Sequence, residues 1–344
     1  MRTLFSASVG GTIARLVLVS VLMPSVVSGG ESQSSPGQPS DAPSHTTRAG
    51  LAATTEPFGA PPGTWTIDAF QADLFTGAST AQIPIVTPPG AGGVGPKIVL
   101  GYHSSTVDER GARDQAQGTG LGWTLDVGGF VFRDLKNTTT TTDDTFKLVL
   151  GGASHDLVLI DSAQNIYHTK DEIFVRIQYV AASDYWILTT KDGTQHRFGY
   201  NTDSKAMTRG QDLTTAITYK YFLDQATTTS GVAVHYMYTK QTGTIASNGQ
   251  TYDQAVYPAR ITYAYAGGSL IESAREVLFT YAPRSDWTDT SASTILSFFE
   301  KDRLDTIEVR AASSLVRRYL LTFDYSIDRD PATPGAAGRR GTSR

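Results

Sequence analysis

Short runs in which apolar and polar residues alternate follow one another from about Trp65 to Tyr325. Between Lys97 and Tyr102, for example, Ile98, Leu100 and Tyr102 fall on one face of an extended strand. Gly, Pro, Asn and Asp bound these runs roughly every ten residues, and helical periodicity is nearly missing after the amino-terminal segment. The pattern predicts an all-β fold of extended antiparallel sheets, arranged as a β-sandwich or a shell.

Two further alternating runs lie at 172–179 and 318–325, and we expect each to form one strand. The surest hairpin is at Asp192-Gly193, which separates the apolar run ending at Thr190 from the run Gln195 to Phe198. An Asp-Gly pair suits a two-residue turn in which both residues have positive φ.

The first thirty residues have the layout of an export signal. Arg2 and Arg15 precede an apolar run from Leu16 to Met23, which Pro24 ends. We expect residues 1–30 to form a signal helix that is removed, and the protein to be secreted or displayed at the cell surface. The alternative is a membrane anchor, but the run falls short of the about 20 apolar residues that a spanning helix needs.

The rest of the chain divides by composition. Residues 31–63 are rich in Ser, Pro, Gly, Ala and Thr and predict a disordered linker, because they offer too few apolar side chains for a core. We expect a first β module at 64–135 and a second antiparallel β region at 136–327. Residues 328–344 have no strand pattern, and predict a disordered tail or a truncation.

Charge and cysteine content exclude several classes of partner and of chemistry. The formal net charge is -4 and charged residues make up 18% of the chain, so neither nucleic acid nor an anionic membrane is an expected partner. The chain has no Cys, which excludes disulfides, thiolate metal sites and thiol nucleophiles.

Proline and glycine mark special backbone positions in the first module. Pro84 has no amide donor and therefore belongs on an edge strand or at a bulge. Pro88 and Pro89 stiffen a turn, and we expect Gly90 to supply conformational freedom at its exit. Pro88, Pro89 and Gly90 form a Pro-Pro-Gly turn that follows the strand containing Pro84.

A second cluster has the form Gly-Leu-Gly-Trp. Gly120 and Gly122 allow the backbone to approach a neighbouring strand closely, and Trp123, which faces the same way as Leu121, is expected to be a buried anchor. We interpret these residues as structural.

These elements stand in order between Asp73 and Arg133, with the strand ending at Tyr102 between them. Their arrangement resembles the opening module of SpvB-like proteins, of the B components of insecticidal toxin complexes and of large YD-repeat (RHS) proteins. The resemblance extends to about Tyr325, through the Asp192-Gly193 hairpin, an Arg284/Asp286 turn and a strand containing Arg303 and Leu304.

The resemblance implies a structural segment of a β shell that encloses or delivers a carboxyl-terminal toxin. The implied partners are a downstream YD-repeat shell and a toxin cargo, both outside this sequence. The alternative is a stand-alone cell-surface module that binds carbohydrate or protein through exposed aromatic residues.

Catalytic patterns are missing from the sequence, so we do not expect an enzyme, a cofactor or a metal. There is no Gly-x-Ser-x-Gly elbow, and no His-Glu-x-x-His pattern. His103, His155, His168, His196 and His235 are scattered singly on strand-like stretches. Asp143 and Asp144, like Asp328 and Asp330, are expected in solvated turns. A glycoside hydrolase that uses paired carboxylates is the enzymatic alternative, because their separation depends on tertiary structure.

Overall fold

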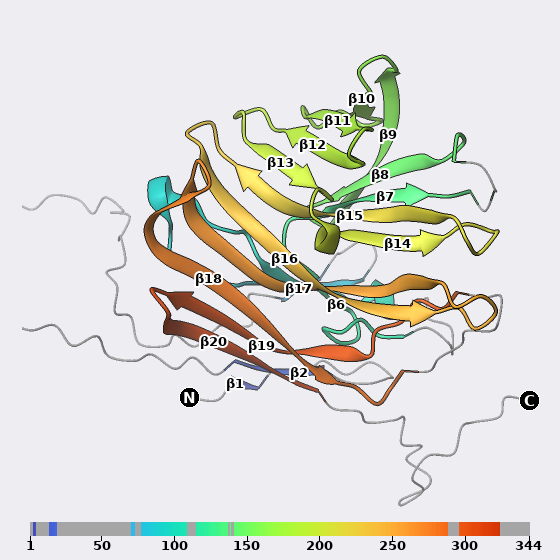
Figure 1. Cartoon of the computed structure of the whole chain (residues 1–344). Coiled ribbons are helices and arrows are strands. Elements are labelled where there is room, and N and C mark those ends of the chain that lie inside the picture. The colour runs from blue at the N-terminus through green and yellow to red at the C-terminus, as the bar shows by residue number, and fades with distance from the viewer. Residues whose placement is uncertain are drawn as a thin grey trace, which may run out of the picture.

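The computed structural model describes residues 3–4, 14–18, 70–72, 77–108, 115–136, 138, 141–287 and 296–323. Within these residues the fold is all-β, as predicted: the longest α-helix, α1 (Ser105–Asp108), spans four residues. Two short 3₁₀ helices, η2 (Ala91–Gly93) and η3 (Thr202–Ser204), lie in connections. The strands form a small sheet, a closed barrel and an open sheet that continues from the barrel (Figure 1).

The small sheet has the order β3-β4-β5-β6 and is antiparallel throughout. Its strands are β3 (Phe70–Ala72), β4 (Ser79–Pro84), β5 (Val99–His103) and β6 (Trp123–Asp126). On β5 the alternation behaves as expected, because Leu100 and Tyr102 are buried while Gly101 between them is only partly buried.

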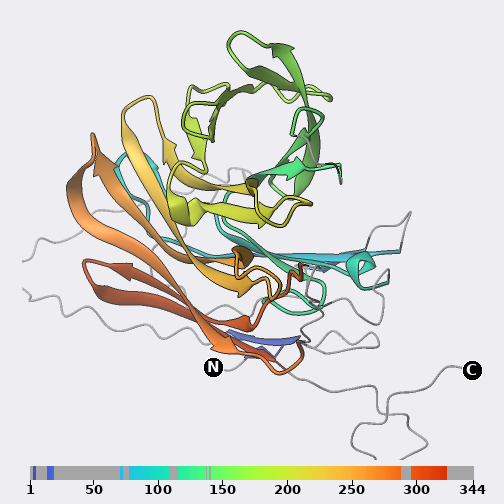
Figure 2. The same ribbon diagram turned by 45° about the vertical axis from the view of Figure 1, so that its right-hand side comes forward.

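The barrel closes because β15 pairs with β7 as well as with β13 and β16. This pairing completes a ring of antiparallel strands, which Figure 2 shows nearly end on. The ring consists of β7 (Phe130–Asp134), β8 (Thr145–Leu150), β9 (Ala153–Asp161), β10 (Ile166–Thr169), β11 (Arg176–Val180), β12 (Tyr185–Thr189), β13 (Gln195–Phe198) and β15 (Ala216–Thr227). β14 (Lys205–Arg209) pairs with β15 outside the ring.

Side chains fill the barrel, as expected for a ring of this size. Trp186 is fully buried, and the rings of Phe146, Tyr167 and Tyr179 lie 4.8, 5.0 and 4.8 Å from it. These four aromatics come from four different strands, β8, β10, β11 and β12. The barrel is therefore a packed aromatic core that fixes the relative positions of its strands.

The open sheet continues from β15 through long antiparallel strands that twist across the molecule (Figure 1). These are β16 (Val232–Thr244), β17 (Thr251–Ala266), β18 (Ser269–Pro283), β19 (Asp302–Ala311) and β20 (Ser314–Phe323). Beyond β20 lie the short pieces β2 (Ala14–Leu18) and β1 (Thr3–Leu4). Most of residues 1–63 lies outside the described residues, so the signal helix and the linker remain predictions, as does the tail at 328–344.

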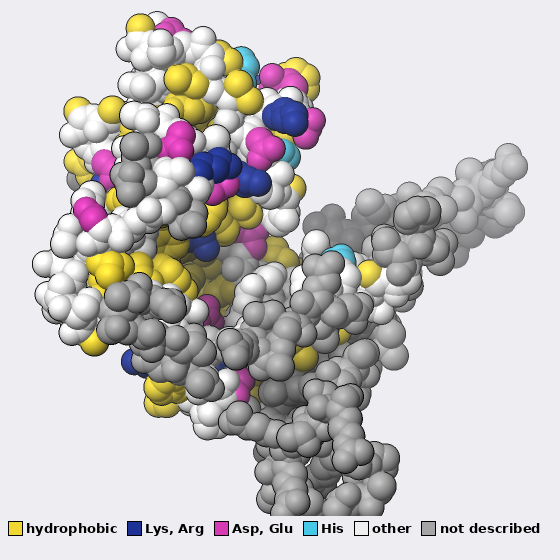
Figure 3. Space-filling model, turned by 90° about the vertical axis from the view of Figure 1, so that its right-hand side faces the viewer, with side chains coloured by type: hydrophobic (Ala, Val, Ile, Leu, Met, Phe, Trp, Pro, Cys, Tyr) yellow, Lys and Arg dark blue, Asp and Glu magenta, His cyan; other side chains and the backbone are white. Residues whose placement is uncertain are grey.

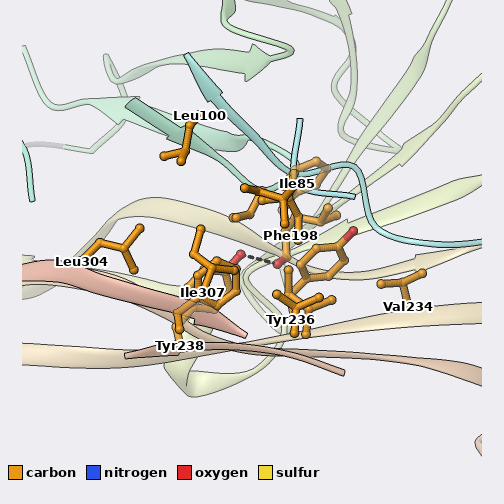
Figure 4. Close-up of a cluster of buried hydrophobic side chains, with 14 of the residues drawn as sticks. Ile85, Leu100, Phe198, Val234, Tyr236, Tyr238, Leu304 and Ile307 are labelled. Carbon is orange, nitrogen blue, oxygen red and sulfur yellow. Dashed lines mark hydrogen bonds between the residues drawn. The ribbon is translucent and has the colours of Figure 1, made fainter. Parts of the chain in front are cut away.

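The small sheet packs on one face of the open sheet as a β-sandwich. In Figure 4, Ile85 and Leu100 lie on the side of the small sheet, and they face Tyr236, Ile307 and Leu304 of the open sheet. All of these side chains belong to one continuous buried cluster that also reaches into the barrel. The expected first module at 64–135 thus contributes β7 to the barrel, and the expected region at 136–327 contributes both barrel and open sheet.

Two local predictions need correction. The hairpin between β12 and β13 is present, but only Gly193 has positive φ (81°), and the amide of Gly193 donates to the carbonyl of Thr190. The turn is therefore a three-residue loop whose last residue is left-handed, because Asp192 instead uses its carboxylate to accept from Thr190 and Thr194. Similarly, the strand expected at 172–179 begins only at Arg176, because Phe174 has a φ of 59° and is 71% exposed.

Candidate functional site

The Pro-Pro-Gly turn is fastened to the open sheet by two buried tyrosines. The amide of Val86 donates to the Tyr319 hydroxyl at 2.9 Å, and the Tyr263 hydroxyl donates to the carbonyl of Pro88 at 2.8 Å. Tyr263 and Tyr319 are 0% and 2% exposed, so these bonds lie away from solvent. The turn is consequently a docking element between the two sheets of the sandwich.

The backbone of this turn corrects one expectation. Gly90 has φ −87° and ψ −168°, an extended conformation that other residues adopt, whereas Gly92 and Gly93 have positive φ. The glycine-specific geometry therefore lies in η2, after the turn. Pro84 ends β4, opposite Val99 of β5, and β3 pairs only with the other end of β4. Within the described residues, the missing amide of Pro84 thus faces an unpaired edge.

The Gly-Leu-Gly-Trp corner closes the small sheet. Trp123 is 7% exposed, and its ring centroid lies 5.3 Å from that of Tyr102 on the neighbouring strand. Gly122 has a φ of 77°, and a Cβ there would come within 2.7 Å of the Tyr102 ring. Gly120 has a φ of 108°, and its carbonyl accepts from the Trp123 amide. The two glycines are therefore needed for Trp123 to pack on Tyr102.

The segment before this corner is held against the far end of the open sheet. Gln115 exchanges side-chain hydrogen bonds with the backbone N–H and C=O of Glu300, and the amide of Gly118 donates to the Glu300 carboxylate. Arg284 pairs with Asp286 through two nitrogens at 2.6 and 2.7 Å and donates to the carbonyl of Ala116 at 2.7 Å. The Arg284/Asp286 turn is thus a clamp on the first module.

The strand motif at Arg303 and Leu304 completes this contact. Leu304 is 1% exposed, and its amide donates to the carbonyl of Gly118 at 2.8 Å. The Arg303 guanidinium lies 5.0 Å from the centroid of the Phe323 ring. The Pro-Pro-Gly turn and the segment at Gly118 thus both contact the open sheet, whereas Arg133 and the Asp192-Gly193 hairpin belong to the barrel.

Arg133 lies in the barrel, and its contact with Asp144 corrects the expectation that Asp144 lies in a solvated turn. Its Nε is 2.7 Å from Oδ2 of Asp144, whose side chain is only 1% exposed, and the guanidinium lies 5.4 Å from the Phe146 ring centroid. The N–H direction falls outside hydrogen-bond geometry, so this contact is an ion pair alone. Asp144 is therefore a buried partner of Arg133 and is not in a solvated turn. Asp143, in contrast, is exposed and accepts from Thr138.

Sequence reasoning missed a cluster of aromatic residues around Lys220 on the outer wall of the barrel. The Lys220 Nζ lies 4.0 Å from the centroid of Phe130 and 5.4 Å from that of Phe222. Phe222 in turn is 5.2 Å from Tyr238 of the open sheet. Figure 3 shows a hollow in the described surface, with hydrophobic side chains along its wall and charged side chains among them.

The aromatic wall continues away from Lys220. Successive ring centroids are 6.5 Å apart for Phe132 and Tyr219, 5.4 Å for Tyr219 and Phe298, and 5.7 Å for Phe298 and Tyr252. Tyr252 is buried, whereas Phe298 is 50% exposed. We call this set the aromatic hollow: Phe130, Phe132, Tyr219, Lys220, Phe222, Tyr252 and Phe298.

Burial shifts the pKa of Lys220 in the aromatic hollow and that of the nearby Glu300. It lowers the pKa of Lys220, and the nearby Glu300 carboxylate opposes this effect. Burial also raises the pKa of Glu300, against the hydrogen bond from Gly118 and the positive charges of Arg284 and Lys220. The charges of Lys220 and Glu300 interact electrostatically, but their charged atoms are not within ion-pair distance. Of the two groups, Glu300 has a positive partner, because Nη1 of Arg284 lies 3.9 Å from its Oε2.

Among the described residues, no three His, Asp or Glu side chains come together as a metal site. His103, His155, His168, His196 and His235 lie on separate strands, β5, β9, β10, β13 and β16. In the described part of the chain, no helix has the length and apolar character needed to cross a membrane.

The described chain is thus an all-β scaffold. It consists of a closed barrel, an open sheet that continues from the barrel, and a small sheet packed on the open sheet. The N-terminal domain of the effector protein SpvB from Salmonella typhimurium strain LT2 is similar, with a TM-score of 0.50 and 16% identity over 71% of this chain and 94% of that domain. The crystal structure of TcdB2-TccC3-TEV is similar over 78% of this chain, with a TM-score of 0.54 and 18% identity.

These comparisons establish the fold, that of an SpvB-like and toxin-complex-like segment, which confirms the resemblance drawn from the motifs. The chain spans only 15% of the length of the toxin-complex chain. No family model matches the sequence. A search of curated proteins likewise gives no match.

Proposed function

We propose that this chain is a non-catalytic wall segment of a toxin-complex or RHS type protein, in which it forms part of a β shell around a toxin cargo. The observation that supports this most is the fold itself, because almost the whole SpvB N-terminal domain and one segment of a toxin-complex structure share it. A packed barrel and a small sheet docked on the open sheet suit a wall.

The junction gives this role a physical basis. Arg284, Gln115 and the two buried tyrosines fix the first module on the open sheet through hydrogen bonds at several separate points. A wall segment must resist local opening, and buried bonds distributed over one face provide such resistance. Partners of the wall are then the downstream YD-repeat strands and the cargo.

The experiment is limited proteolysis of the protein expressed together with the coding sequence that follows it. A wall segment predicts a carboxyl-terminal fragment that is protected from protease in the assembled protein and becomes cleavable after Arg284→Ala weakens the junction. Equal cleavage of that fragment in the presence and absence of this segment contradicts the proposal. Binding to a glycan array by the chain alone would favour the surface module.

The proposed lack of catalytic activity is tested separately. The purified chain is screened for hydrolase and transferase turnover, and we expect none. A turnover that one conservative substitution abolishes without loss of folding would overturn this part of the proposal.

Export is proposed on the charge and hydropathy pattern of residues 1–30. Amino-terminal sequencing of extracellular protein should give a start near Glu31. Extracellular protein that retains Met1 would contradict cleavage.

A further inference from the structure

The orientation of Lys220 results from a β-bulge in β15. Lys205 pairs with Tyr221, Ala206 with Lys220, and Met207 with Thr218, so Tyr219 is the additional residue. Because of this bulge, Thr218 and Tyr221 can both reach the Asp184 carboxylate, at 2.8 and 2.7 Å. Tyr219 and Lys220 are instead directed to the aromatic hollow, where Tyr219 contacts Phe298.

The ammonium group of Lys220 lacks an anionic partner within the described residues. It has three donors, and it lies over the faces of two aromatic rings, 4.0 Å from the centroid of Phe130 and 5.4 Å from that of Phe222. Glu300 is engaged by the amide of Gly118 and lies 3.9 Å from Arg284. A partly buried cation without a hydrogen-bond acceptor is costly, and this cost is relieved when an anion enters the hollow.

We propose that the aromatic hollow binds a polypeptide segment in which an Asp or Glu carboxylate pairs with Lys220 and a neighbouring aromatic or large aliphatic side chain packs on Tyr219 and Phe298. A polypeptide fits better than a small acid because the aromatic wall runs on from Lys220 through three successive ring contacts. Half of the Phe298 surface is exposed, which leaves a face for the neighbouring side chain. This site does not depend on the proposed shell function.

The test compares two peptides, acetyl-Ala-Phe-Asp-Leu-Ala-amide and its Asn counterpart, by isothermal titration to the full chain. A charge-assisted pair to Lys220 predicts that the Asp peptide binds at least about tenfold more tightly than the Asn peptide. Lys220→Gln should abolish this preference, and Lys220→Arg should retain it. Phe298→Ala should weaken both peptides while leaving the preference in place.

Lys191→Gln is the matched control, because Lys191 also lies over an aromatic ring, that of Phe174 at 5.7 Å, but on the β12–β13 hairpin outside the hollow. It should leave both affinities unchanged. Circular dichroism melting establishes that each variant is folded. Equal binding of the Asp and Asn peptides, or a preference that survives in Lys220→Gln, overturns the site. Binding of 3-phenylpropionate as tight as that of the Asp peptide overturns the polypeptide occupant.

Discussion

The hydroxyl of Tyr263 donates a 2.8 Å hydrogen bond to the backbone carbonyl of Pro88, which is 175 residues earlier in the chain. Tyr263 is fully buried in the open sheet, and Pro88 belongs to the turn that leaves the small sheet. This bond therefore connects a sequence motif of the first module to the face on which that module docks.

Tyr263→Phe should lower the free energy of unfolding by about 1 kcal/mol, because it removes one hydrogen bond and keeps the ring. Urea denaturation measures the change. Tyr200→Phe is the control: Tyr200 is 51% exposed and should change stability by less than about 0.5 kcal/mol. Equal effects of the two substitutions would mean that the Pro88 contact does not stabilise the junction.

Gly122→Ala should be more destabilising than Gly231→Ala. Both glycines have positive φ, 77° and 81°, so both substitutions carry a conformational cost of roughly 1–2 kcal/mol. Only at Gly122 would the new methyl group meet a side chain, the Tyr102 ring at 2.7 Å, which adds about 1–3 kcal/mol of overpacking. The difference between the two variants in chemical denaturation isolates the packing of the corner. A difference near zero would show that Tyr102 moves aside freely.

The strands were predictable because alternation of apolar residues follows directly from the two-residue period of a strand. Leu100 and Tyr102 are buried on one face as that period requires. Closure of the barrel was not predictable, because it depends on the pairing of Phe130–Phe132 with Lys220–Phe222 across many intervening strands. No local pattern encodes a pairing between segments so far apart.

The aromatic hollow was missed for a related reason. Thr218 to Phe222 has the composition of a strand, but only the bulge at Tyr219 decides that Tyr221 faces the barrel interior and Lys220 the hollow. Phe174 similarly defeats simple alternation, because a left-handed residue inside a run interrupts the strand. A single irregular residue reverses the face of every residue that follows it.

Trp123→Ala should lower the free energy of unfolding by about 3–5 kcal/mol, the typical cost of removing a large buried ring. Trp123 is 7% exposed and packs against Tyr102, so no solvent contact offsets the loss. Thermal melting and soluble yield are the measurements, and Trp123→Phe should recover part of the stability. A variant that melts like the parent protein would contradict the anchor role of Trp123.

Acid should destabilise the barrel through His196. Burial lowers the pKa of His196, with Asp192 acting in the opposite direction and Lys97 adding to the effect. The unfolded chain therefore takes up a proton more readily than the folded one, so stability is retained above about pH 6.5 and is lost as the pH falls through the folded pKa. Each unit by which the pKa is lowered corresponds to about 1.4 kcal/mol of lost stability.

Urea denaturation between about pH 7.5 and pH 5.5, about one unit above the ordinary pKa of Glu, measures this dependence. His196→Gln should reduce the slope of stability against pH, and adding His235→Gln should reduce it further, since burial also lowers the pKa of His235. His168→Gln is the control, because the side chain of His168 is 46% exposed on β10. An unchanged slope in the double variant would locate the acid sensitivity elsewhere. A reduced slope would instead mean that acid destabilises the folded chain at these two buried histidines, on β13 and β16.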